Sequence, residues 1–301
     1  MDDANPDDGY KLLKEAGFQA VDFSLHTYLK NTDIYKQELN SFFNKTTEEL
    51  KQYFLPQKIA AEKNNIEFHQ MHMPYPLYVP TSSRETNDYM VNVVASKSLE
   101  ICSFLNCSYI VIHGFKLNRF VGSEVAEWQE TEAFIHKIAP VAKEMGITIC
   151  IENLYDSIGK HLIEGPCCNA RLSAERIDRI NDKYGVEVLG YCLDTGHANL
   201  IGIDFQSFIE KLGSRLKVLH IHDNDGAMDL HQIPYTFTKT RENKASTDWD
   251  GFIEGLRNIG YAGTINFETA PVLKAFPNEL KFEALKMIAA IGRYFEGRIK
   301  E

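Results

Sequence analysis

The sequence has no apolar run that approaches the roughly 20 residues a helix needs to cross a membrane. Its first ten residues, MDDANPDDGY, are acidic and lack the basic and apolar regions of a signal peptide. From these two absences we expect a cytoplasmic protein without a membrane partner.

Positive charge is in deficit. The 32 Lys and Arg residues stand against 42 Asp and Glu, which gives a formal net charge of -10. Nucleic-acid binding relies on clustered Lys and Arg. The charge balance therefore argues against a nucleic-acid partner, although it leaves room for a local basic patch.

Cysteine is present but carries no recognisable motif. The six cysteines lack the spacing of a zinc knuckle or of a CxxC redox pair. Cys167 and Cys168 are adjacent, which does not suit a mutual disulfide. We expect buried, reduced thiols rather than a disulfide framework.

What the chain does contain is an alternation of short apolar runs and longer segments of helical period. Mostly apolar strands separated by helices are typical of parallel strands buried on both faces. This pattern predicts an α/β fold, a (β/α)₈ TIM barrel. The seven runs are AVDFSL (20–25), IEFHQMHM (66–73), YIVIHG (109–114), ITICIEN (147–153), VLGYCLD (188–194), KVLHIHD (217–223) and TINFET (264–269).

The barrel interpretation leaves one strand unaccounted for. The chain opens on NPDDGYKLLKEAGF, a capped helix by its pattern, with no strand before it. We expect the first strand to be missing or irregular. A doubly wound open sheet is the alternative, but no Gly-rich dinucleotide fingerprint follows any strand. No linker or repeat divides residues 1–301, so we predict a single domain.

Six consecutive predicted strands end in an imidazole or a carboxylate. Each such residue alone has an ordinary structural reading, such as a hydrogen-bonded histidine or a helix cap. Together they lie at the end of the barrel where active sites form. Burying several carboxylates near one axis is costly unless a cation neutralises them, and imidazole with carboxylate suits Zn²⁺, Mn²⁺, Fe²⁺ or Co²⁺. The sequence therefore predicts a divalent-metal site among His72, His113, Glu152, Asp194, His197, His220, His222, Glu268 and, from a loop, Asp229 and His231.

Two histidines of the sixth run lie two residues apart. His220 and His222 therefore point to the same side of a strand, into the barrel. His222 lies nearer the rim and is the expected metal ligand. His220 is expected one layer below, as a partner of the ligands or as a packed structural group.

The polar residues stand in short motifs: IEN with Glu152, LDTGH with Asp194 and His197, HIHDND with His222, and NFET with Glu268. In these motifs, and from about residue 5 to the C-terminus, the chain resembles the xylose isomerase-like TIM barrel superfamily. That superfamily includes ketose 3-epimerases, inosose-processing enzymes and the apurinic endonuclease IV group.

Resemblance to the epimerase branch implies one divalent ion (Mn, Co, Zn, Fe or Mg) held by Glu152, Asp194, His222 and Glu268. The ion would bind the carbonyl and adjacent hydroxyl of a ketose. The two glutamates would then remove a proton from one face and return it to the other, through a cis-enediolate. His197 would hydrogen-bond the substrate oxygen on which charge grows. We therefore expect a metal-dependent sugar isomerase or epimerase of carbohydrate metabolism.

The endonuclease branch implies a different site, with three zinc ions and about nine ligands, for each of which this chain has a candidate. Against it, the loops after the strands carry more aromatics and prolines than basic residues, which suits a small-molecule sugar substrate better than DNA. In the sugar interpretation the pocket residues are His72, His113, His197, Asp229 and His231. A lyase or dehydratase on the same scaffold stays open, and the loop aromatics allow a homodimer that covers the site.

One departure from the sugar-processing relatives concerns the mouth of the site. Those relatives have a short glycine-containing turn before the DW pair that opens the next helix. Here the insert YTFTKTRENKAST separates Pro234 from Asp248 and Trp249. We therefore do not transfer any relative's particular substrate to this chain.

Overall fold

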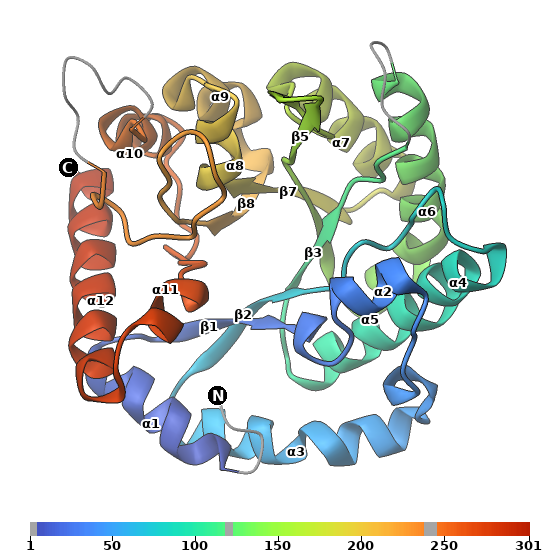
Figure 1. Ribbon diagram of the computed structural model, residues 1–301, viewed down its shortest axis with the longest axis horizontal. Helices are drawn as coiled ribbons and strands as arrows, with labels where there is room; N and C mark the ends of the chain where they lie inside the picture. The colour runs from blue at the N-terminus through green and yellow to red at the C-terminus, as the bar shows by residue number, and fades with distance from the viewer. Residues whose placement is uncertain (1–4, 118–122, 238–245) are drawn as a thin grey trace.

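A curled parallel sheet forms the centre of the molecule, and helices surround it (Figure 1). The computed structural model describes residues 5–117, 123–237 and 246–301. The six strands run in the order β1-β2-β3-β4-β7-β8, and neighbours pair in parallel, which confirms the predicted α/β barrel. The strands are β1 (Ala20–Ser24), β2 (Glu67–His72), β3 (Tyr109–His113), β4 (Thr148–Glu152), β7 (Leu189–Asp194) and β8 (Leu216–His220).

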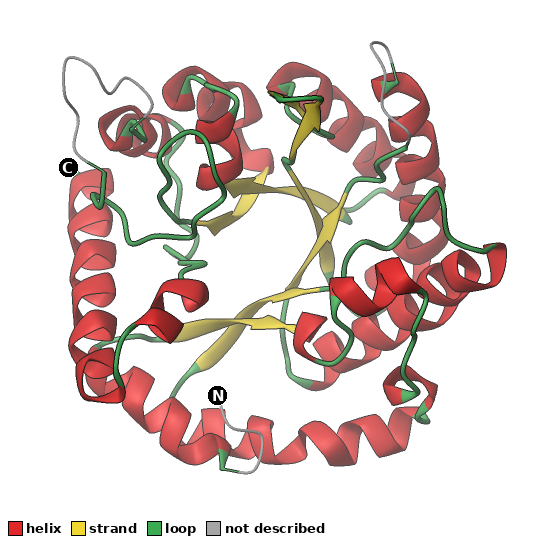
Figure 2. Cartoon of the chain, viewed as in Figure 1, coloured by secondary structure: helices red, strands yellow, loops and turns green. Residues whose placement is uncertain are grey.

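Helices alternate with these strands along the chain and lie outside them (Figure 2). Local signals fix several helix starts: Thr46 and Glu49 form a capping box, and Asp204 accepts a hydrogen bond from the Ser207 backbone. The helices are α1 (Pro6–Ala16), α2 (Asn31–Lys36), α3 (Thr47–Lys63), α4 (Arg84–Tyr89), α5 (Ala95–Phe104), α6 (Glu124–Glu144), α7 (Ala170–Tyr184), α8 (Thr195–Leu200), α9 (Phe205–Leu212), α10 (Trp249–Asn258), α11 (Ala270–Ala275) and α12 (Asn278–Lys300). Short 3₁₀ or π turns occupy Leu25–Thr27, Phe42–Asn44, Met90–Val94 and Gly213–Arg215.

Apolar side chains fill the interior of the barrel below its polar mouth. Val111, Cys150, Cys192 and Val218 form a fully buried cluster, one from each of four adjacent strands. Each lies two residues before the last residue of its strand. Its side chain therefore points to the same face of the sheet as that last residue, one layer deeper in the barrel. Burying a Val side chain contributes about 1.5–3 kcal/mol. This layer therefore gives the polar strand ends a rigid apolar floor.

The sheet is open between β1 and segment 264–269. Within the described residues no strand precedes α1, and β1 pairs only with β2. Segment 264–269, predicted as the seventh strand, makes a single parallel bridge from Phe267 to Ile221 instead of an extended ladder. A cavity of about 430 Å³ lies along the opening, bordered by Val21 and Ile265. Within the described residues the first strand is thus missing or irregular, as predicted. Segment 264–269 consequently has a pairing partner on one side only.

A two-stranded hairpin follows β4 and was not predicted. Its antiparallel strands are β5 (Tyr155–Ile158) and β6 (His161–Glu164). Gly159 begins the connecting turn with a φ of +62°, a conformation that glycine adopts without steric cost. The hairpin lies at the mouth of the barrel, beside α8.

The cysteine prediction is confirmed: all six thiols are buried and free. Among the described residues, no helix is both long enough and apolar enough for a bilayer span.

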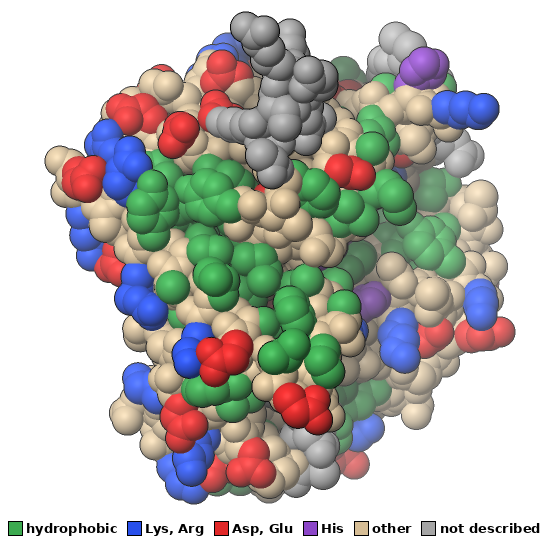
Figure 3. Space-filling view, turned by 60° about the vertical axis from the view of Figure 1, so that its left-hand side comes forward, with side chains coloured by type: hydrophobic (Ala, Val, Ile, Leu, Met, Phe, Trp, Pro, Cys, Tyr) green, Lys and Arg blue, Asp and Glu red, His purple; other side chains and the backbone are tan. Residues whose placement is uncertain are grey.

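An apolar stripe runs along the exposed side of α12. Leu280, Met287 and Tyr294 lie seven residues apart, on one face of the helix, and are 49%, 57% and 47% exposed. Figure 3 shows hydrophobic side chains gathered over the side of the molecule that carries this helix. The homodimer expected from the sequence stays a prediction.

Candidate functional site

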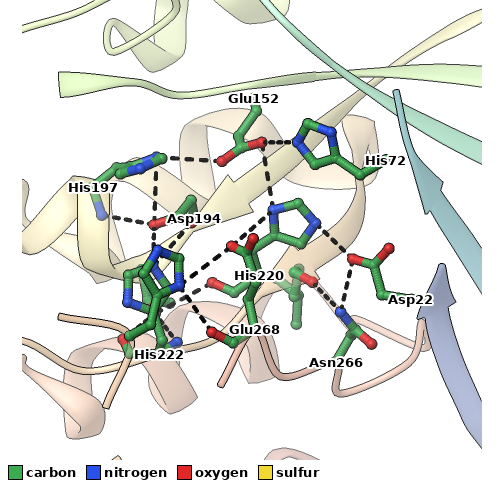
Figure 4. A network of polar contacts seen from close by, with 12 residues as sticks. Asp22, His72, Glu152, Asp194, His197, His220, His222, Asn266 and Glu268 are labelled. Atoms are coloured by element: carbon green, nitrogen blue, oxygen red, sulfur yellow. Dashed lines mark hydrogen bonds and ion pairs between the residues drawn. The ribbon is translucent and has the colours of Figure 1, made fainter. Parts of the chain in front are cut away.

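The polar residues predicted at the strand ends meet at one mouth of the barrel. The pairing register sets His113 beside Glu152 and Asp194 beside His220. Glu152, Asp194 and His220 are fully buried, and Figure 4 shows their side chains turned toward one another. Parallel strands present their carboxyl ends on the same side, so neighbouring strands converge here.

Glu152 is the centre of the network, because four imidazoles surround its carboxylate. Oε2 lies 3.2 Å from His72 Nε2, 3.3 Å from His113 Nε2 and 3.4 Å from His220 Nδ1, while Oε1 lies 3.3 Å from His197 Nδ1. Burial alone would raise the pKa of Glu152, but the charge of His220 and contacts with His113 and His197 hold it well below its usual range. Burial lowers the pKa of His113 to about 4, so this imidazole is neutral at pH 7. Glu152 is therefore an ionised carboxylate among nitrogen donors.

Asp194 is fixed by the local structure that follows β7. Its Oδ1 accepts a hydrogen bond from the His197 backbone N–H at 2.7 Å, which caps α8. The side chain of Asn153 exchanges two hydrogen bonds with the Asp194 backbone, both 2.9 Å long. His222 Nε2 lies 3.1 Å from Oδ1 and from Oδ2. A Cβ on Gly196 would come within 1.8 Å of the His222 ring, so the DTGH motif needs glycine there.

His220 is held from both sides. Its Nε2 lies 2.9 Å from Asp22 Oδ2, while Nδ1 faces Glu152 Oε2 at 3.4 Å and Glu268 Oε2 at 3.6 Å. Gln70 donates a hydrogen bond to Asp22 at 3.0 Å, which orients that carboxylate. A metal-binding imidazole is usually oriented by a carboxylate that contacts the ring nitrogen not bound to the metal. The sequence prediction placed His220 one layer below the ligands; in the structure its Nδ1 faces the carboxylates of both Glu152 and Glu268.

The loop after β8 folds over the cluster, as predicted for Asp229 and His231. Asp229 Oδ2 lies 3.4 Å from His197 Nε2 and 3.4 Å from His231 Nε2. The His231 ring stacks on His222 with centroids 4.0 Å apart. Burial lowers the pKa of His231, but the contact with Asp229 and the charge of Glu268 outweigh it and raise the pKa to about 9.

Glu268 meets Glu152 at one ring nitrogen of His220, because the Oε2 atoms of both carboxylates lie near Nδ1. Burial raises the pKa of Glu268, whereas the pKa of Glu152 is lowered. Two carboxyl groups whose environments push their pKa values apart are the usual signature of an acid and a base. Glu152 is thus an ionised carboxylate, whereas Glu268 retains a proton more readily.

The donor set fits a divalent cation. Four groups of three side chains bring ligand atoms within 4.8 Å of one another. In addition, His222 Nδ1, His220 Nδ1 and Asp229 Oδ1 are buried without a hydrogen-bond partner. Nitrogen and carboxylate donors at this spacing suit Zn²⁺, Mn²⁺, Fe²⁺ or Co²⁺. The groups are His72–Glu152–His220, His222–Asp229–His231, Glu152–Asp194–His197 and Asp194–His222–Glu268.

The structure brings together all of the residues predicted for the site and adds one that sequence reasoning missed. Asp22 lies in the first apolar run, where a single carboxylate among apolar residues was the only signal. Residues 238–245 of the predicted insert lie outside the described residues. The predicted site residues are His72, His113, Glu152, Asp194, His197, His220, His222, Asp229, His231 and Glu268.

Comparison with known proteins agrees with the barrel fold. Residues 10–289 match the family model described as xylose isomerase-like TIM barrel. An uncharacterized protein of Sinorhizobium fredii is 30% identical over 127 residues, a match that spans 38% of this chain and only 37% of that protein. An uncharacterized protein of Methanocaldococcus jannaschii is 24% identical over 86% of this chain and 82% of its own length.

Solved structures share the fold. A D-psicose 3-epimerase is 16% identical with a TM-score of 0.68, and the match covers 97% of this chain and 93% of that one. A D-tagatose 3-epimerase-like protein is 20% identical with a TM-score of 0.61 over 94% and 97% of the two chains. A 3-keto-D-glucoside 4-epimerase from E. coli is 15% identical with a TM-score of 0.65 over 96% and 94%.

Proposed function

Because the chain belongs to the xylose isomerase-like TIM barrel family, we propose that it is a divalent-metal-dependent isomerase or epimerase of a sugar, a cyclitol or a related keto compound. The structural neighbours named as sugar epimerases support this proposal. The observation that carries it is the pair of glutamates whose carboxylates meet at one nitrogen of His220, Glu152 at 3.4 Å and Glu268 at 3.6 Å from Nδ1.

Three carboxylates, Glu152, Asp194 and Glu268, are the proposed oxygen ligands, and two histidines compete as the nitrogen ligand. His222, the ligand expected from the sequence, contacts Asp194 at 3.1 Å. His220 contacts both glutamates and has Asp22 behind it, which favours His220 for an ion held between Glu152 and Glu268.

The proposed chemistry is proton transfer next to a carbonyl. A bound divalent ion supplies positive charge that stabilises the oxyanion formed during the reaction. Glu152, ionised in its imidazole surroundings, removes the proton from the carbon between carbonyl and hydroxyl. Glu268, whose pKa is raised by burial, returns a proton to the opposite face of the resulting cis-enediolate.

His197 is the proposed donor to the substrate oxygen. Burial would lower its pKa, but Asp194, Asp229 and Glu152 outweigh burial and hold it well above the usual range. Its Nδ1 lies 2.9 Å from the Asn153 carbonyl, which fixes the ring, and Nε2 lies toward the mouth of the barrel, 3.4 Å from Asp229 Oδ2. A charged, oriented donor of this kind stabilises developing negative charge.

The proposal is tested by proton exchange with solvent. The protein, loaded with Mn²⁺ or Co²⁺, is incubated in heavy water with D-fructose, D-tagatose, D-allulose and a keto-cyclitol. NMR and mass spectrometry should show deuterium on the carbon next to the carbonyl of at least one compound. Loss of water from the labelled product would identify a dehydratase on the same scaffold. Absence of deuterium from every compound of the panel and from the disaccharides lactulose and isomaltulose, with metal bound, contradicts the proposal.

We expect the substitution Asp22→Asn to weaken divalent-metal affinity about 10–100-fold, because an outer carboxylate that orients a histidine typically contributes that much. Competition against a fluorescent chelator measures the affinity. Asp33→Asn, which changes a half-buried residue of α2, is the matched control. Unchanged affinity in Asp22→Asn would show that His220 is not a ligand and would leave His222 in that role.

A second candidate function is a trinuclear zinc phosphodiesterase. It is favoured by the group His222, Asp229 and His231, which lies next to the glutamates and could hold a further ion. The net charge of -10 does not favour a DNA substrate. An abasic DNA duplex incubated with zinc-loaded protein decides between the two: nicking supports the phosphodiesterase, and an intact duplex excludes it.

A further inference from the structure

A cleft leads outward from the carboxylate cluster to the surface. It has a volume of about 460 Å³, and its inner end is lined by His113, His197 and Asp229. Tyr35 from α2 lies among the lining residues farther along the cleft, together with the loop after β2 and the first residues of β5. We call this part the outer cleft and define it by Tyr35, Tyr75, Tyr78, Lys116, Tyr155 and Asp156.

Rigid aromatic rings form the walls of the outer cleft. Tyr75 packs between His26 and His113, with ring centroids 4.7 and 4.4 Å away. Tyr78 stacks on Phe115 at 5.3 Å. Because each ring rests on another ring, both tyrosines are held in place before any ligand binds.

The β5–β6 hairpin extends one wall outward. Tyr155 at its start lies with its ring 5.3 Å from the His197 ring. Lys116 Nζ donates a hydrogen bond to the Tyr155 carbonyl at 2.6 Å and lies over the ring at 5.6 Å. The next residue, Asp156, lines the same cleft as Tyr35, so the hairpin and α2 border it together.

The chemistry of the outer cleft suits a neutral, hydroxyl-bearing ring. Aromatic faces pack against the C–H faces of a sugar, and tyrosine hydroxyls, a carboxylate and an amide offer hydrogen bonds to its hydroxyl groups. In the outer cleft one carboxylate, Asp156, stands against one ammonium, Lys116, so neither sign of charge is in excess there. Compounds of one ring fill only the inner end, where the carboxylate cluster lies.

We infer that the outer cleft is a subsite for a second sugar ring, so that the substrate is a glycoside or disaccharide whose reacting ring lies at the carboxylate cluster. This inference rests on the proposed function for the identity of the inner ring. The subsite can be tested by binding alone, without catalytic turnover, because the second ring would contact residues outside the carboxylate cluster.

Isothermal titration calorimetry on the metal-loaded protein tests the subsite with defined probes. D-fructose provides one ring, and lactulose and isomaltulose provide fructose joined to a second sugar. We expect at least one two-ring probe to bind about tenfold more tightly than D-fructose. Tyr35→Ala should remove most of that advantage and leave D-fructose binding unchanged. Tyr35 is 61% exposed, so its truncation leaves the fold intact.

The control variant is Tyr294→Ala, at a tyrosine on α12 that is 47% exposed and lies outside the cleft, and it should bind all probes as the wild type does. Equal affinity for one-ring and two-ring probes, or an advantage that survives Tyr35→Ala, overturns the subsite. A two-ring advantage that Tyr35→Ala removes, in a protein that shows no deuterium exchange with any probe, upholds the subsite and refutes the proposed catalysis. The two proposals therefore fail separately.

Discussion

Replacing Glu268 by glutamine is expected to lower the rate of deuterium exchange into the substrate about 10³-fold, within the range that one general acid–base group contributes. The amide preserves the size of the side chain and an oxygen that can contact a metal, but it cannot carry the proton. The loss should appear in kcat, with KM nearly unchanged, because the proton is transferred only in the reaction itself.

The control for Glu268→Gln is Glu283→Gln, which breaks only an exposed ion pair with Lys286 on α12. This control should exchange protons at the wild-type rate. Metal content of both variants is measured alongside, so that loss of the acid–base group is separated from loss of the ion. Exchange at the wild-type rate in Glu268→Gln refutes the two-glutamate mechanism.

Removing the divalent ion is expected to lower the melting temperature by about 6–16 °C. A ligand present at 100–1,000 times its Kd stabilises a protein by about 3–4 kcal/mol, and each kcal/mol corresponds to roughly 2–4 °C for a chain near this size. The physical reason is that Glu152, Asp194, Asp229 and Glu268 lie close together with unpartnered ligand atoms beside them. Without a cation their mutual repulsion opposes folding.

Calorimetry of chelator-treated protein, before and after addition of Mn²⁺ or Zn²⁺, measures this shift. Asp194→Asn should lose most of it, since one ligand charge is gone. Asp178→Asn removes a carboxylate from a surface pair with Arg215 and should retain the full shift. A melting temperature that does not respond to metal in the wild type contradicts the account.

The barrel and most of the site were predictable because both follow from a sheet of parallel strands. Each apolar run identifies a strand, the strands share one orientation, and the last residue of each is thereby placed at the same mouth. His113, Glu152 and Asp194 follow from that rule alone: the register pairs His113 with Glu152, and Asp194 lies on the next strand, two residues beyond the partner of Glu152.

What the sequence could not show depends on contacts between distant segments. Asp22 lies 198 positions before His220, and nothing local to either residue predicts their 2.9 Å contact. The β5–β6 hairpin was missed because its short strands are polar and half-exposed, so they lack the apolar run that identified the others. The reduction of segment 264–269 to one bridge follows from the opening beside it, which is a property of the assembled sheet.

Metal content per chain tests the central claim most directly. Elemental analysis of protein purified without chelator should find about one divalent ion per chain, shared by the carboxylates Glu152, Asp194 and Glu268. Close to three zinc ions would instead place His72, His113, Asp229 and His231 among the ligands and favour the phosphodiesterase. A protein that binds no divalent ion, even after reloading with Mn²⁺, Co²⁺ and Zn²⁺, would contradict the account of this site.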